Sequence, residues 1–408
     1  MGSVIVIGGG AAGMAAAVTA AMCGDQVTVV ERMDRVGKKI LATGNGRCNL
    51  MNSGPLRFPG GGSFAESILS VMTADVQRDF WQHLGLRLRQ EEGGRVYPVS
   101  GAATTVLDTL RNAMRVLGVQ VCTCVSATEI RRGKRGWIVQ AGEQQFSTDR
   151  IIAAGGGCAQ PKLGSDGSLW PVLTRLGHTL IPPRPTLTQI VTETAPIRGL
   201  SGIRLRTDIS ITRGEQFKYA ESGELLFADY GVSGVCAMQC ARYAEPGDTL
   251  HINLVRALGF QTPAELRQEL LRRRAAWRSV ADMSPVEFMT GLCVPKVAQS
   301  LMRAAGIEHP QNDNLAVISE KTISRIVRCA ADFKLTITGV KGFDNAQVTA
   351  GGLDVNEFSA ATLESKLLPG LHAAGEMLDV DGDCGGFNLM FAFGSGILAG
   401  LNGRDIPW

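Results

Sequence analysis

Glycines near the N-terminus have the spacing of a phosphate-binding turn, in the run Gly8-Gly9-Gly10-Ala11-Ala12-Gly13. Gly8 permits a tight turn, and Gly10 lets a pyrophosphate approach the backbone. Gly13 lets the following helix pack closely against the preceding strand. Backbone N–H groups and the positive end of the helix dipole would then face the phosphates. The spacing predicts a dinucleotide cofactor site, against the alternative of an ordinary strand–helix turn.

The elements that must position this turn are present on both sides of it. Residues 3–7 form a short β-branched run typical of a buried strand, and 11–23 form an alanine-rich helix. A second strand, 26–30, ends at Glu31, whose carboxylate can accept a hydrogen bond from a ribose hydroxyl. The residues expected to bind the cofactor here are Gly8, Gly10, Ala11, Ala12, Gly13, Glu31 and Arg32.

The next segment helps to distinguish FAD from NAD. An NAD dehydrogenase would normally continue with another helix and strand, but this chain has a glycine-rich polar loop at 43–49. Asparagine and arginine side chains in this loop suit hydrogen bonding to a pyrophosphate or to the polar edge of a ring; the alternative is a flexible surface loop. The residues expected to bind the cofactor are Lys38, Lys39, Thr43, Gly44, Asn45, Gly46, Arg47, Cys48 and Asn49.

Later strands also run into glycine clusters. A strand predicted at 119–125 is followed by a meander and then by an apolar strand with a glycine cluster, 150–157. A further strand at 369–376 ends in glycine and glutamate, and the glycine-rich segment 383–390 opens an apolar helix. The cofactor contacts expected from these segments are Val125, Ala154, Gly155, Gly156, Gly375, Glu376, Asp383, Gly385, Gly386, Phe387 and Asn388.

Each late cluster has a predicted task. Val125 would lie near the adenine, and the carboxylate of Glu376 would face the ribitol chain of a flavin. The helix start at 385–388 offers backbone donors and a dipole to the pyrimidine edge, where negative charge builds on reduction. A buried packing helix is the alternative. All clusters in this order favour FAD over NAD as the tightly held cofactor.

These segments resemble the bacterial flavoproteins that include bile-acid Δ4,6-reductase-like proteins and chains labelled aminoacetone oxidase. The matching strings are GGGAAGMAAA, GKKILATGNGRCNLMN, AQVTAGGL and TLESKLLPGLHAAGEMLDVDGDCGGFNLMFAFGSG, with a weaker match in GRVYPVSGAATTVLDTL. The resemblance implies an α/β fold, with a Rossmann-type two-dinucleotide FAD-binding domain interrupted by a β-barrel and a small helical subdomain. Phe387 stands where the family is expected to have tyrosine, so no relative's substrate can be transferred safely.

The resemblance places the FAD domain at 1–188 and 341–408 and the inserted substrate domain at 189–340. The insert has β-type segments at 204–212, 249–254 and 333–339. A helical subdomain is expected at about 258–320, with helices at 263–279 and 285–305. Four arginines in it resemble a nucleic-acid patch, but nearby glutamates favour a solvated helix face; these arginines are Arg272, Arg273, Arg274 and Arg278.

The expected chemistry is that of an FAD-dependent oxidoreductase. We expect NAD(P)H to reduce the flavin, which then delivers hydride to an activated C=C or C=O of a small organic substrate. No second glycine motif in strand–turn–helix context exists for a nicotinamide, so NAD(P)H would bind transiently. Tyr97 is a candidate proton donor and Cys48 a candidate for adduct formation or flavin tuning. A packed tyrosine and a buried spectator thiol are the alternatives.

Other functional classes stay open at this point. An amine oxidase that uses O₂ would need the same fold, and a tRNA-modifying flavoprotein would need a broad basic face. A non-catalytic flavoprotein would hold a flavin that no physiological donor reduces. A dithiol oxidoreductase is disfavoured because the chain has no CxxC. No metal site is expected, since Asp379, Asp381 and Asp383 form a stretch too short for a calcium loop.

Composition sets the remaining bounds. A net charge of +3 is too small to indicate nucleic acid or an anionic membrane as a partner. No apolar run reaches the ~18 residues of a membrane span, and no signal peptide is recognisable. Ten scattered cysteines without an export signal predict reduced thiols and a cytoplasmic protein. The sequence does not predict the oligomeric state.

Overall fold

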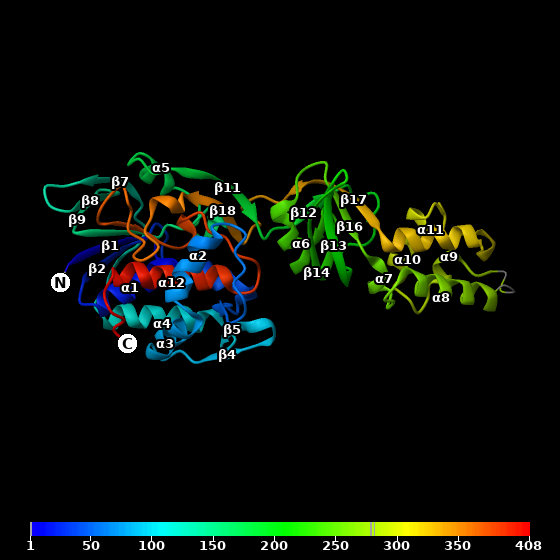
Figure 1. The fold of residues 1–408 in the computed structure, drawn as a ribbon, viewed down its shortest axis with the longest axis horizontal. Coiled ribbons are helices and arrows are strands. Elements are labelled where there is room, and N and C mark those ends of the chain that lie inside the picture. The colour runs from blue at the N-terminus through cyan, green and yellow to red at the C-terminus, as the bar shows by residue number, and fades with distance from the viewer. Residues whose placement is uncertain (1, 278–279, 281) are drawn as a thin grey trace. The chain divides into compact units, whose positions relative to one another are not determined.

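The computed structural model describes residues 2–277, 280 and 282–408, which form two compact units. One unit contains the chain up to Pro185 together with Phe343–Trp408, and the other is Thr186–Gly342. Both ends of the chain therefore lie in the same unit, as the N and C labels in Figure 1 show. The domain limits expected from the resemblance, 188/189 and 340/341, lie close to these divisions.

A five-stranded parallel sheet forms the centre of the first unit. Its strand order is β19 (Leu371–Ala373), β10 (Arg150–Ala153), β1 (Ser3–Ile7), β2 (Gln26–Val30) and β6 (Gln120–Cys122). All residues of β10 and β19 are buried, as expected for parallel strands covered on both faces. Because the strands are parallel, their carboxyl ends meet at one edge, where ligands of open α/β sheets bind.

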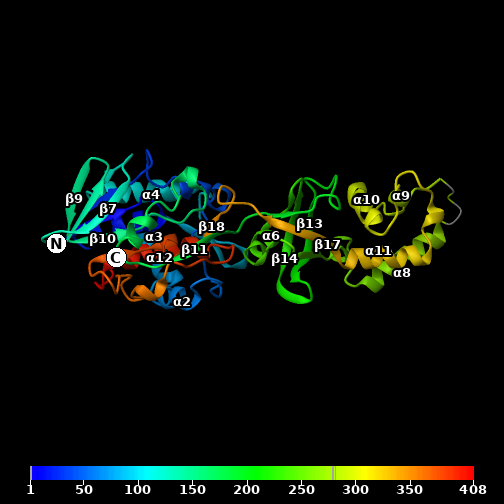
Figure 2. The same cartoon turned by 90° about the horizontal axis from the view of Figure 1, so that it is seen from above.

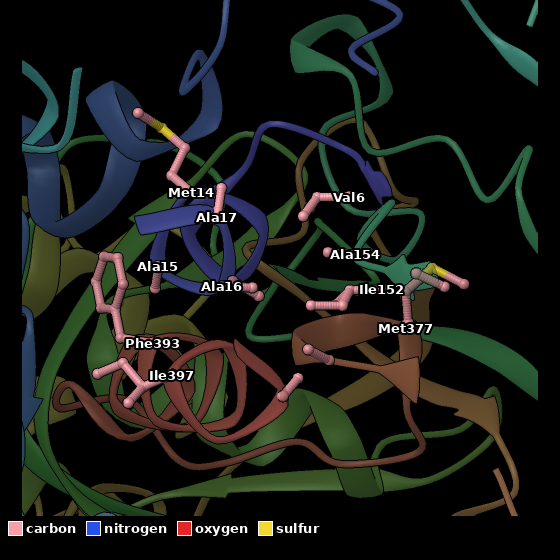
Figure 3. Packing of buried hydrophobic residues seen from close by; sticks show 14 of the residues in the cluster. Val6, Met14, Ala15, Ala16, Ala17, Ile152, Ala154, Met377, Phe393 and Ile397 are labelled. Atoms are coloured by element: carbon pink, nitrogen blue, oxygen red, sulfur yellow. The ribbon is translucent and has the colours of Figure 1, made fainter. Parts of the chain in front are cut away.

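Helices α1 (Ala11–Met22) and α12 (Phe387–Leu401) pack against each other beside this sheet (Figure 3). Their approach requires small residues, because a Cβ on Gly396 would overlap the carbonyl oxygen of Ala12. The alanines of α1 are almost completely buried in the same core. The first and last helices of the Rossmann unit thus lie side by side.

Smaller elements complete the first unit. The predicted meander is confirmed as an antiparallel sheet of β7 (Ala127–Arg132), β8 (Trp137–Ala141) and β9 (Gln144–Thr148). The predicted strand at 119–125 is too long: only β6 forms, because the backbone at Cys124 turns to φ 59° and its N–H donates to Met33 O. The other strands and α-helices are β3 (Met51–Asn52), α2 (Gly62–Val71), α3 (Ala74–His83), β4 (Leu88–Gln90), β5 (Arg95–Pro98), α4 (Ala103–Val116), α5 (Trp170–Thr174), β11 (Leu180–Thr186) and β18 (Val348–Leu353).

The second unit contains the predicted barrel. It is closed in the order β12 (Ile190–Thr192), β15 (Gly231–Ser233), β14 (Gln216–Ala228), β13 (Arg204–Arg213), β16 (Thr249–Ile252) and β17 (Phe333–Val340). The three strand segments expected from the sequence correspond to β13, β16 and β17. Helix α6 (Val235–Cys240) packs on β14 of the barrel.

The helical part of the second unit differs from the prediction in two ways. The expected helix 285–305 is broken into α9 (Pro285–Phe288) and α10 (Pro295–Ala304), because Gly291 adopts a left-handed φ of 83° and Pro295 starts a new helix. The expected limit at 320 is also wrong, since α11 (Glu320–Ala331) continues beyond it and packs on α8 (Pro263–Ala276; Figure 2). A short helix, α7 (Leu254–Ala257), precedes α8.

Three arginines of helix α8 have carboxylate partners. Glu269 accepts hydrogen bonds from Arg272 at 2.8 Å and from Arg273 at 2.7 Å. These two guanidinium groups lower the pKa of the Glu269 carboxyl to about 2. Arg274 lies 3.8 Å from Glu320, and Arg278 is outside the described residues. This pairing supports the interpretation of α8 as a solvated helix face.

Candidate cofactor site

The glycine turn lies where three parallel strands end together. The N–H of Ala154, after β10, donates to Ile7 O at 2.8 Å, and the N–H of Ala374, after β19, donates to Ala153 O at 2.9 Å. A Cβ on Gly8 would overlap the carbonyl oxygen of Ala154. Gly8 is therefore required by the close approach of two strand ends, and the segments predicted from opposite ends of the chain do meet.

The two other motif glycines have different surroundings. A Cβ on Gly13 would overlap the carbonyl oxygen of Gly8, so this glycine is needed for the helix to begin against the turn. A Cβ on Gly10 would meet no heavy atom within 4 Å. Gly10 precedes α1, whose first residues have no side-chain cap. An open position beside uncapped helix N–H groups fits the pyrophosphate of a dinucleotide.

Glu31 supports the turn from inside. Its carboxylate accepts hydrogen bonds from the N–H of Gly9 and the N–H of Met33, both at 2.7 Å, and the residue is 7% exposed. The N–H of Val125 donates to Glu31 O at 3.0 Å, so these two predicted cofactor residues are neighbours. A carboxylate oxygen has further lone pairs, so a ribose contact stays compatible with these bonds. Arg32 is instead paired with Asp166.

The two lysines after the turn have separate partners. Lys38 Nζ lies 2.5 Å from Asp34 Oδ1. Lys39 Nζ lies 2.7 Å from Glu376 Oε2 and thereby joins the loop after β2 to the end of β19. Glu376 Oε1 accepts the N–H of Thr349 at 2.7 Å. Glu376 is thus fixed by residues from two distant parts of the chain.

Thr349 on β18 borders the candidate site, and no motif in the sequence indicated it. Its Oγ1 accepts hydrogen bonds from the N–H groups of Cys158 at 2.8 Å and Ala159 at 3.0 Å. It therefore ties the segment after the predicted Ala154–Gly156 cluster to Glu376. Thr349 lies inside the string AQVTAGGL, so the resemblance to the family was the one signal that pointed to it.

A shallow cavity of about 370 Å³ lies beside the same loop. Its lining is Arg35, Lys38, Leu41, Ala42 and Leu163. A Cβ on Gly164, next to Leu163, would lie 4.0 Å from Glu31 Oε1. The cavity therefore lies near Glu31, and its lining combines apolar side chains with Arg35 and with Lys38, whose ammonium is paired with Asp34.

The loop 43–49 reaches the N-terminus of α12. A Cβ on Gly386 would lie 2.8 Å from Asn49 Oδ1 and 2.6 Å from Met51 O, and its φ of 107° also disfavours other residues. Asn49 is 9% exposed, and its Oδ1 has no hydrogen-bond partner among the residues that the structure describes. A buried acceptor without a partner, beside a helix N-terminus, fits the polar pyrimidine edge of a flavin.

Three predicted residues around α12 have structural tasks in the described chain. The Asn388 side chain donates to Gly382 O and accepts from Gly382 N, each at 2.8 Å, and so closes the turn before the helix. Asp383 Oδ2 lies 2.8 Å from Arg57 Nε. The Phe387 ring packs edge-on against Phe58 at 6.0 Å. Cofactor contacts from these residues stay predictions, with the backbone at 385–387 as the available donor group.

The two candidate catalytic side chains are both buried. Cys48 is 0% exposed, and burial raises the pKa of its thiol to about 12. This environment argues against the suggested adduct chemistry, because the thiolate is the reactive form. Tyr97 on β5 is 7% exposed, and the guanidinium of Arg47 stacks over its ring at 4.1 Å. Tyr97 thus packs under Arg47, and its role as proton donor stays a prediction.

The burial of Cys48 has a measurable consequence. In the native protein near pH 8, we expect maleimide to label the exposed Cys124 quickly and Cys48 at least ~100-fold more slowly. Peptide mass spectrometry over a time course measures both rates. Cys48→Ala is expected to keep its bound flavin, whereas loss of flavin or fast labelling of Cys48 would contradict the assignment as a buried spectator.

His372, which lies in the string TLESKLLPGLHAAGEM, takes no part in the chemistry of the site. His372 is within β19 and fully buried, and burial lowers its pKa to about 4. Its Nε2 lies 2.9 Å from Asn402 Oδ1, which fixes the ring inside the strand. Within 2–277, 280 and 282–408, no three His, Cys, Asp or Glu side chains are grouped to hold a metal ion. Over the same residues, no helix is long and apolar enough to cross a membrane.

Known proteins match this chain over all or nearly all of its length. The family model described as "HI0933-like protein Rossmann domain" matches residues 2–402. A 3-dehydro-bile acid delta(4,6)-reductase from Clostridium scindens is 35% identical and covers 100% of both chains. A ribosomal RNA dihydrouridine synthase from Haemophilus influenzae is 27% identical over 98% of this chain and 97% of its own. Its Escherichia coli counterpart is 25% identical over 96% and 95%.

Proposed function

Since the chain belongs to the HI0933-like family of Rossmann-domain proteins, we propose that it reduces a C=C bond conjugated to a carbonyl group. It is an FAD-dependent oxidoreductase. The observation that carries the proposal is the full-length 35% identity to a reductase of that bond type. It is combined with a glycine turn, Gly8 to Gly13, that leaves space for a dinucleotide at Gly10. The names of the more distant relatives also imply saturation of a conjugated C=C, here in uracil.

The residues divide the task of holding FAD. The uncapped N–H groups at the start of α1 would bind the pyrophosphate beside Gly10, and Glu31 would bind the adenosine ribose. Glu376, fixed by Lys39 and Thr349, would face the ribitol chain. The N-terminus of α12 would stabilise negative charge at the pyrimidine edge. When bound, FAD supplies hydride transfer, and NAD(P)H is the proposed transient donor.

A uridine in ribosomal RNA is the second candidate substrate. The observation that favours it is the match to two rRNA dihydrouridine synthases over nearly the whole chain. Against it stand the higher identity to the bile-acid enzyme and the carboxylate-paired arginines of α8. We favour a small-molecule enone, with no nucleic-acid partner. We also propose the cytoplasm as the compartment, because ten cysteines suit reducing conditions.

An anaerobic visible spectrum of the purified protein tests the proposal. We expect a flavin spectrum that NADH or NADPH bleaches and that a 4,6-dien-3-one bile acid restores. Bleaching by a simple amine alone would replace the reductase with an oxidase. Reoxidation by unmodified ribosomal RNA, but by no enone, would make RNA the substrate. A protein that binds no FAD on reconstitution would refute the cofactor assignment.

A further inference from the structure

A cluster of two arginines, one glutamate and one tyrosine lies beside the candidate cofactor site. Glu91 Oε1 is 2.5 Å from Arg47 and 2.9 Å from Arg89, so two guanidinium groups share a single carboxylate oxygen. The Arg47 guanidinium also stacks over the Tyr97 ring at 4.1 Å. Counting one negative and two positive groups, the cluster carries one uncompensated positive charge.

The cluster adjoins the N-terminus of α12 through a hydrogen-bonded bridge. Asn52 Nδ2 donates to Gly93 O at 3.1 Å and to Gly385 O at 2.9 Å, which fixes the turn after Glu91 against the glycines before α12. On the other side, Asn49, which follows Arg47 by two residues, lies against Gly386. The cluster and the proposed flavin edge therefore share one border, built by loop 43–49 and the turn at 92–94.

Arg47 is both held in place and accessible. Stacking and the ion pair fix the guanidinium plane, while 39% of the side chain is exposed. A guanidinium has five N–H donors, and the bond to Glu91 uses the NH2 nitrogen, so donors are left for another oxygen. A preorganised cation stabilises a developing oxyanion without reorganising during the reaction.

We propose that Arg47 binds the carbonyl oxygen of the hydride acceptor and stabilises it as an enolate oxygen. The inference rests on the proposed reduction of a conjugated C=C. Hydride from the reduced cofactor bonds to the β-carbon, and the π electrons of the C=C move toward the carbonyl to give C–O⁻. A solvent proton then bonds to the α-carbon, and the C=O bond reforms. Glu91 and Tyr97 act as positioning residues for Arg47.

The experiment uses a phenolate as a stable enolate mimic. Binding of 4-chlorophenol to the oxidised holoprotein is followed by the change in flavin absorbance at several pH values. We expect wild-type affinity to rise with pH across the pKa of the phenol, because Arg47 prefers the anion. Arg47→Gln is expected to lose about 10- to 100-fold of that affinity and its pH dependence. Arg47→Lys should recover part of that affinity and part of its pH dependence. Tyr97→Leu removes the stacking partner of Arg47 without changing the charge of the cluster, and its affinity should lie between those of wild type and Arg47→Gln.

Controls separate this inference from the proposed function. Arg115→Gln removes an arginine that is exposed on α4 and should bind 4-chlorophenol like wild type. Arg47, expected from the sequence to bind the cofactor, is assigned by this inference to the substrate, so Arg47→Gln should keep the wild-type ratio of flavin to protein. Loss of flavin from Arg47→Gln would overturn the inference, because Arg47 would then be a cofactor ligand. Wild-type affinity for 4-chlorophenol in Arg47→Gln would also overturn it, as would a wild-type protein that does not bind 4-chlorophenol. Bleaching of wild type by NAD(P)H tests the proposed function without involving Arg47.

Discussion

Gly13→Ala is expected to abolish FAD binding and to destabilise the first unit. The added Cβ would overlap the carbonyl oxygen of Gly8, so α1 must move away from β1. Overpacking of this kind costs about 3 kcal/mol at the upper end of its usual range. The shift also displaces the helix N–H groups from the pyrophosphate position. Urea unfolding of the apoprotein and the flavin-to-protein ratio after reconstitution measure the two effects.

Gly10→Ala is the matched control, because it tests the effect of the glycine turn on FAD binding without destabilising the fold. Gly10 has φ −82° and ψ −165°, which alanine adopts without strain, and its Cβ would meet no heavy atom within 4 Å. The apoprotein should therefore unfold as the wild type does, or be more stable by about 0.4–1 kcal/mol. FAD affinity should fall about 10- to 100-fold, because the methyl group occupies the approach to the backbone donors. Wild-type FAD affinity in Gly10→Ala would refute the assignment of the glycine turn as the pyrophosphate site.

Glu376→Ala is expected to have the second large effect, on stability and on FAD binding together. The change leaves the Lys39 ammonium and the Thr349 N–H without their carboxylate, at side-chain exposures of 22% for Lys39 and 20% for Glu376. An unsatisfied partly buried group costs about 1–3 kcal/mol. The same carboxylate is the proposed ribitol contact, so FAD release should be faster. Urea unfolding of the apoprotein and stopped-flow measurement of FAD dissociation test both parts.

A double-mutant cycle isolates the ion pair. Lys39→Met and Glu376→Gln, singly and together, should show a coupling energy of about 0.5–2 kcal/mol. Glu66→Ala, on the exposed face of α2, provides the control and should change neither stability nor FAD dissociation. Additive effects of the first two changes would show that the 2.7 Å contact contributes nothing to stability.

Much of the site's backbone could be predicted because its signals are local. The strand, glycine turn and helix at 3–23 follow from β-branched residues, glycine spacing and helix propensity within one short segment. The same holds for the meander of β7, β8 and β9. The resemblance extended these local predictions to the closed barrel, which the short strands alone would not have identified.

Boundaries were less predictable where one residue changes the backbone direction. Apolar spacing is continuous across 285–305, yet Gly291 and Pro295 divide it into two helices. Similarly, alternation predicts a strand through 119–125, but the turn at Cys124 ends β6 early. Periodicity reports which face is apolar, whereas the conformation of a single residue decides where an element stops.

The sequence by itself determined the family, the dinucleotide cradle and the order of the segments that build it. Only the tertiary structure decided which side chains are free to act. Lys39 and Glu376 are separated by 337 positions, and Thr349 acquires its task solely through contacts with Cys158 and Glu376. The physical reason is that backbone conformation depends mainly on neighbouring residues, whereas pairing, burial and pKa depend on what the folded chain brings into contact.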